Sequence, residues 1–228
     1  MYYLSEIQAA IEKPEGTYLK VFVPNEGIVN NITKYKVGNI INSEIRIDDR
    51  RTITNQQRAK IFATIKDISV YTGDHPEDLR AFLLYDYCIA TGEIPFSLSN
   101  CSISQAKEFI TFIIDFILKH NIPLSDAALN RTDDIDKYLY MCIKYRKCSI
   151  TGQANADIHH CTGSRIGMGG DRRQASNKGR ELIALSREWH NRVHQEGEKT
   201  IFDLYKIYGI TVSEDTLKEL KLSKADLI

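Results

Sequence analysis

The pattern of apolar and polar residues predicts strands in the first hundred residues of the chain. Residues 17–23 (TYLKVFV) form a short apolar run before a turn, and residues 44–48 (EIRID) alternate apolar with charged side chains. Both patterns are typical of β-strands. Residues 96–99 (FSLS) predict a further short strand.

Helices are expected around these strands, because apolar residues recur there at spacings of three and four. Thr54 and Ser102 are each followed three residues later by Gln, which is the pattern of a capping box at the start of a helix. The predicted helices cover residues 54–73, 76–90, 102–121 and 134–146.

The low-information stretch 121–133 is the best candidate for a domain boundary, because the composition changes after it. The chain of 228 residues has a formal net charge of zero, yet residues 141–200 carry eleven basic and six acidic side chains. We therefore expect an α+β protein with a mixed strand and helix domain at residues 1–130 and a second domain at residues 131–228.

Composition excludes several other classes of protein. Hydrophobic residues make up 43% and charged residues 26%, which is typical of an ordinary globular protein. No apolar run approaches the roughly 20 residues of a membrane-spanning helix, and the first residues lack the pattern of a signal peptide. The five cysteines are odd in number and form no C-x-x-C motif. We therefore expect a cytoplasmic protein with no membrane partner.

Four of the six histidines fall in one part of the chain, as the pair His159-His160 and as His190 and His194. His190 and His194 are four residues apart, so on a helix begun by Ser186 they share one face. With a third imidazole from a neighbouring strand, they would form a site with three protein ligands and an open position. A closed structural zinc site and plain surface histidines remain as alternatives.

A glycine-rich, basic loop lies between the two histidine pairs, over residues 163–180. Glycine lets the backbone approach a ligand closely, and arginine binds phosphate through two hydrogen bonds. The loop therefore supplies candidate DNA contacts, although a solvated, flexible loop would have the same composition. These candidates are Arg165, Arg172, Arg173, Lys178 and Arg180.

The region from Cys148 to Ile207 resembles the ββα-metal finger of the HNH nuclease superfamily. In that family a first strand ends in an Asp-His or His-His pair, a second apolar strand ends in Leu-Cys or Leu-Ser, and a helix carries two more histidines. His159-His160, residues 182–186, and His190 with His194 match these parts in turn. The resemblance implies a metal ligand at His159 and a general base at His160. It also implies metal ligands or scissile-phosphate contacts at the two helix histidines.

Two departures from the family pattern concern the remaining site residues. The family asparagine stands nine residues before the first helix histidine, which here is Glu181, while Asn177 is nearby but off register. Glu181 is therefore the candidate for that catalytic position. Many relatives bind a structural zinc through two C-x-x-C knuckles, which this chain lacks, so no structural zinc is expected. Cys148 and Cys161 are then expected to be buried thiols.

The residue types suit phosphodiester hydrolysis. The reaction needs an activated water, and imidazole titrates near neutral pH. It also needs stabilisation of the charge on the phosphate and on the departing oxygen, which a divalent metal supplies. Three imidazole ligands favour Ni, Zn or Mn, although Mg or Mn can be the working ion. One divalent metal ion is therefore the expected cofactor.

Residues 44–125 resemble the lambda NinB (Orf) recombination protein, through the matching segments 50–56, 60–69 and 96–104. This resemblance implies binding to single-stranded DNA and to single-strand-binding protein, and a homodimer. Arg50 and Arg51 could contact phosphates, or they could belong to a solvated edge of paired charges. Both halves together resemble HNH nucleases of phages and prophages of Gram-positive bacteria.

The leading hypothesis is a metal-dependent HNH endonuclease with its core at residues 148–207, which acts on DNA in phage recombination or replication. Its substrate could be single-stranded, branched or duplex DNA. The alternative is a recombination mediator that binds single-stranded DNA without cleaving it, and Glu181 is the sequence feature that favours this alternative.

Overall fold

The first part of the chain is a hairpin that is exposed along its whole length. The computed structural model describes residues 3, 5–43, 45, 51–164 and 176–221. Strand β1 (Glu6–Lys13) pairs antiparallel with β2 (Gly16–Phe22), and the short helix α1 (Ile28–Thr33) follows. β2 confirms the strand predicted at residues 17–23, whereas β1 and α1 were not predicted. The strand predicted at 44–48 lies outside the described residues, except for Ile45.

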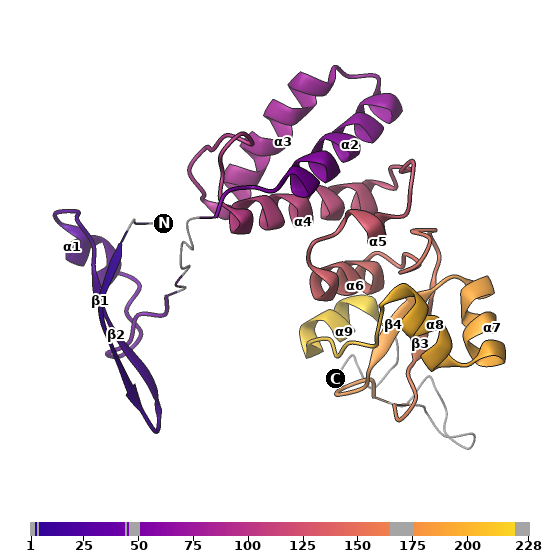
Figure 1. The fold of residues 1–228 in the computed structure, drawn as a ribbon. Helices are drawn as coiled ribbons and strands as arrows, with labels where there is room; N and C mark the ends of the chain where they lie inside the picture. Colours follow the sequence, from indigo (N-terminus) through magenta and orange to yellow (C-terminus); the bar gives the residue numbers. More distant parts are fainter. Residues whose placement is uncertain (1–2, 4, 44, 46–50, 165–175, 222–228) are drawn as a thin grey trace.

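Three helices predicted from the sequence form the next layer, α2 (Asn55–Thr72), α3 (Pro76–Thr91) and α4 (Ile103–His120). Capping boxes begin α2 at Thr54 and α4 at Ser102, as predicted. Figure 1 shows these helices packed side by side. α4 is the most apolar of them, and its buried side chains form the centre of the core.

A buried arginine ties α2 to the chain that follows α4. Arg131 ends the short helix α5 (Ala128–Arg131) and is only 6% exposed. Its guanidinium donates to Asp67 at 3.0 Å and to Thr64 at 3.1 Å, both on α2, and it also pairs with Asp126. These contacts satisfy a charge that would otherwise be costly to bury.

Helix α6 (Ile135–Lys144) connects the helical layer to the last part of the chain. It packs against α4 on one side and against strand β4 on the other (Figure 1). The buried apolar residues consequently form one continuous core from Ile53 to Leu217. α6 therefore belongs to the packing of both halves, while the division at residue 130 stays a prediction about domains.

The remaining elements form a small antiparallel pair of strands with helices beside it. β3 (Asp157–His160) pairs with β4 (Leu182–Leu185), so that His160 lies opposite Leu182. The helices are α7 (Arg187–Glu196), α8 (Glu198–Tyr205) and α9 (Glu214–Leu220). After α8, Ile210 exchanges two backbone hydrogen bonds with Leu182 and so extends the pair by an isolated bridge. The two strands and α7 follow the sequence-based expectation.

The strand predicted at residues 96–99 is wrong. Residues 98–100 form a turn instead, in which the backbone N–H groups of Asn100 and Cys101 both donate to the carbonyl of Ser97. The side chains of Ser97 and Ser99 also bond to each other at 2.8 Å, which favours the turn over an extended ladder.

In the described part of the chain, no helix has the length and apolar character that crossing a membrane requires.

Loss of the buried arginine should cost stability. We expect Arg131→Ala to lower the free energy of unfolding by about 3 kcal/mol, because Asp67, whose side chain is only 14% exposed, would lose its cation. Urea denaturation measures this loss. The control is Arg80→Ala, which removes a more exposed pair with Glu77 and should cost less than about 1 kcal/mol. Equal losses in the two variants would contradict the structural role of Arg131.

Candidate metal centre and active site

The histidines are positioned by the strand β3 and by the first turns of α7. Ser186 caps α7, because its hydroxyl accepts from the backbone N–H of Trp189. Trp189 and Val193 are buried and hold one side of α7 against the core. The four-residue spacing then places His190 and His194 together on the side that faces β3.

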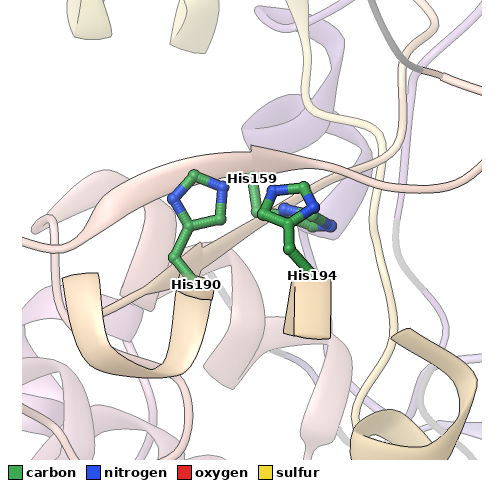
Figure 2. Close-up of side chains that lie close together, drawn as sticks. All are labelled: His159, His190 and His194. Atoms are coloured by element: carbon green, nitrogen blue, oxygen red, sulfur yellow. The ribbon is translucent and has the colours of Figure 1, made fainter. Parts of the chain in front are cut away.

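Three imidazoles meet between β3 and α7. Ligand nitrogens of His159, His190 and His194 all lie within 4.8 Å of one another. The ring centroids are 5.0–5.1 Å apart, and Figure 2 shows the three rings close together, one from the strand and two from the helix. His159 is 1% exposed, so its ring is fixed by the surrounding protein.

Two carboxylates hold the outer sides of these rings. Glu198, the first residue of α8, accepts from Nε2 of His159 at 3.0 Å, and Asp157 accepts from Nδ1 of His190 at 3.4 Å. Each carboxylate selects the ring nitrogen that carries the proton. The lone pair is thereby left on Nδ1 of His159 and on Nε2 of His190.

The protonation state also suits a metal. Burial lowers the pKa of His159 below its ordinary value; His190 and His194 add to this effect, and the bond to Glu198 opposes it. Burial lowers the pKa of His190 as well, against the effect of Asp157. Neutral imidazoles with carboxylate partners are donors that a divalent transition metal ion prefers, so His159 and His190 fit the expected cofactor, and His194 supplies a third ring nitrogen beside them.

His160 points to the opposite face of β3 from His159, because side chains alternate along a strand. Its Nε2 lies 2.7 Å from Oδ1 of Asn177, which is 3% exposed. An amide oxygen can only accept, so Nε2 of His160 carries the proton and Nδ1 has the free lone pair. His160 and Asn177 line one surface hollow.

Glu181 is not part of this contact. It lines a different hollow, together with Asp136, Tyr140 and Gly209. The backbone explains its position, since the carbonyl of Glu181 accepts from the N–H of Cys161 and its own N–H donates to Ser164. The structure thus brings Asn177, and not the residue at the expected register, to the candidate base.

Sequence reasoning missed the contacts of Asn177 and Glu198 for different reasons. Asn177 stands near the expected position in the sequence, but the length of the loop, and not a fixed spacing, decides that it reaches His160. Glu198 follows the glycine that separates α7 from α8, and no spacing rule indicates which ring it would reach. Gly197 has a φ of 96°, a left-handed conformation that favours glycine and lets the chain turn into α8.

The basic candidates are only partly described. Arg165, Arg172, Arg173 and Arg50 lie outside the described residues, and Arg51 is exposed. Lys178 pairs with Glu214 of α9, and Arg180 donates to the carbonyls of Ser164 and Ser176. The side chains of Lys178 and Arg180 are therefore bound to other parts of the protein in this structure. Cys148 and Cys161 are buried thiols, as expected.

The carboxylate on His159 should matter for metal binding. We expect Glu198→Gln to weaken the affinity for Mn²⁺ or Ni²⁺ by about 10–100-fold, because a neutral amide no longer fixes the ring as a carboxylate does. Calorimetry on the whole protein measures this, with His194→Ala as the reference for a lost imidazole. Glu196→Gln, two residues earlier in an exposed pair with Arg192, is the matched control. Equal affinities of the two Gln variants would exclude the role of Glu198.

The comparisons with known proteins agree with this arrangement. Residues 28–223 match the model of one protein family, whose description is "Putative HNHc nuclease". No curated protein and no solved structure gives a significant match to the chain. The matched segment covers most of the chain and includes the whole histidine centre. The chain therefore belongs to this family of HNH nucleases.

Proposed function

We propose that this protein is a metal-dependent endonuclease that hydrolyses phosphodiester bonds in DNA. The observation that carries the proposal is the pairing of a three-imidazole centre with a separate histidine held by Asn177. A site with a purely structural metal has no need of a separate histidine that is oriented by an asparagine. Membership of the HNH nuclease family supports the same reaction.

In the proposed mechanism, His160 is the general base. Its Nδ1 takes a proton from a water molecule while the water oxygen attacks phosphorus and the bond to the 3′-oxygen breaks. Asn177 keeps Nε2 protonated and fixes the ring, so that Nδ1 is available to the water. His159, His190 and His194 hold the divalent ion. That ion would supply Lewis-acid stabilisation of the charge that develops on the phosphate.

The biological setting is also part of the proposal. We propose that the substrate arises in phage DNA recombination or replication, in the cytoplasm of the bacterial host. The likeness of residues 44–125 to the NinB recombination protein supports this setting, as well as contact with single-strand-binding protein and a homodimer. A mediator that binds DNA without cleaving it is the alternative that the first experiment separates.

The first experiment is plasmid nicking with Mn²⁺. We expect the wild-type protein to nick and His160→Ala to lose about 100–10,000-fold in rate, because the general base is removed. His160→Ala should keep its affinity for the metal, which calorimetry measures. His120→Ala, a surface histidine at the end of α4, is the control and should nick normally.

Either of two results would count against the proposal. Wild-type rates in His160→Ala would remove it as the base. Absence of nicking by the wild type on plasmid, branched and single-stranded substrates, together with tight binding of single-stranded DNA, would establish the non-cleaving mediator instead.

A second experiment separates Asn177 from Glu181. We expect Asn177→Ala to slow nicking by about 10–100-fold, because the ring of His160 loses its orientation. Asn177→Asp keeps an accepting oxygen and should restore most of the rate, while Glu181→Gln should stay within about twofold of wild type. Normal nicking by Asn177→Ala with a loss in Glu181→Gln would favour the register expected from the sequence.

A further inference from the structure

The hollow that contains His160 has walls from distant parts of the chain. It has a volume of about 580 Å³ and is open to solvent. Ile158 and His160, on one face of β3, form part of its lining together with Asn177. The ends of two helices complete it, with Arg146 just after α6 and residues 219–221 at the end of α9.

We propose that this hollow binds the phosphodiester backbone of a nucleic-acid strand, with Arg146 and Lys221 as its phosphate-binding residues. The inference rests on the proposed function and adds the path of the substrate. A strand that passes between β3 and the end of α9 brings a phosphate beside His160. Arginine suits this role, because its guanidinium binds phosphate through two parallel hydrogen bonds.

The side chains of Arg146 and Lys221 differ from those of the basic residues in the neighbouring loop, because no other described residue bonds to them. Neither Arg146 nor Lys221 makes a side-chain hydrogen bond or ion pair with another described residue, and both are exposed. Lys178 and Arg180, by contrast, are held by Glu214 and by backbone carbonyls. A phosphate can therefore bind at Arg146 and Lys221 without first breaking a contact to another described residue.

The backbone fixes the position of Arg146 in the lining of the hollow. Arg146 has a φ of 54°, in the left-handed region that residues other than glycine adopt only rarely. Its N–H donates to the carbonyl of Ile143, and its carbonyl accepts from Ala156, just before β3. The next residue, Lys147, is buried and its ammonium donates to Asn121. These contacts fix the backbone of Arg146 and leave its side chain exposed to solvent.

One acidic residue gives the hollow a charge pattern that can be tested in both directions. Glu219 lines the same hollow as the two cations. It repels phosphate, so its neutralisation should strengthen binding, whereas neutralisation of either cation should weaken it. A hollow without a role in binding would show neither effect.

The experiment measures binding of a labelled single-stranded oligonucleotide by fluorescence anisotropy, in EDTA and over a series of salt concentrations. We expect Arg146→Gln and Lys221→Gln each to weaken binding several-fold and to lower the salt slope by about 1. Glu219→Gln should tighten binding. Lys144→Gln is the matched control, because Lys144 is exposed two residues before Arg146 but does not line the hollow. Circular dichroism confirms that each variant is folded.

The outcomes separate this inference from the proposed function. Unchanged binding in Arg146→Gln and Lys221→Gln, or an equal loss of binding in Lys144→Gln, would overturn this inference. If the wild-type protein still nicks DNA, the proposed nuclease function would stand. A wild-type protein that neither nicks nor binds DNA would overturn both. Loss at the two cations, gain at Glu219 and no change at Lys144 would support it.

Discussion

The alternation of side chains along β3 is the constraint on which the site depends. His159 and His160 are neighbours in the chain, yet a strand sends them to opposite faces. One ring meets the histidines of α7, and the other meets Asn177 and the open hollow. A dipeptide thereby supplies both the buried metal ligand and the accessible base that we propose for the reaction. A one-residue slip between β3 and β4 would exchange the two roles.

Helix ends supply most of the remaining geometry. Ser186 begins α7 so that its two histidines face the strand, and Gly197 ends it so that Glu198 can start α8 beside His159. Arg146 and Lys221 follow the ends of α6 and α9. The carboxylate of Glu198 also accepts from the backbone N–H of Thr162, which ties the start of the basic loop to the cluster of three histidines.

The site is small, but the core behind it is not. β4 is buried at every residue and packs on α6, which in turn packs on α4. Burial of apolar surface on this scale holds the short strands in place, since a two-stranded pair alone is only marginally stable. None of the described residues covers the hairpin β1–β2 in this way, and its apolar residues, among them Ile11 and Tyr18, remain exposed.

The sequence by itself determined the features that depend on neighbouring residues. Capping boxes located α2 and α4, apolar spacing indicated the helices, and the four-residue interval placed His190 and His194 on one face. The family resemblance joined these to the pair on β3. Only the tertiary structure decided the contacts whose partners are separated by loops. Asn177 reaches His160 from the loop between β3 and β4, at a position that no fixed spacing gives. The wrong strand at 96–99 is a different case, because a local contact between Ser97 and Ser99 formed a turn there. The contacts of Glu198 with His159 and of Asp157 with His190 also depend on tertiary structure. The packing of α7 on β3 sets which carboxylate lies beside which imidazole, and no interval in the sequence does.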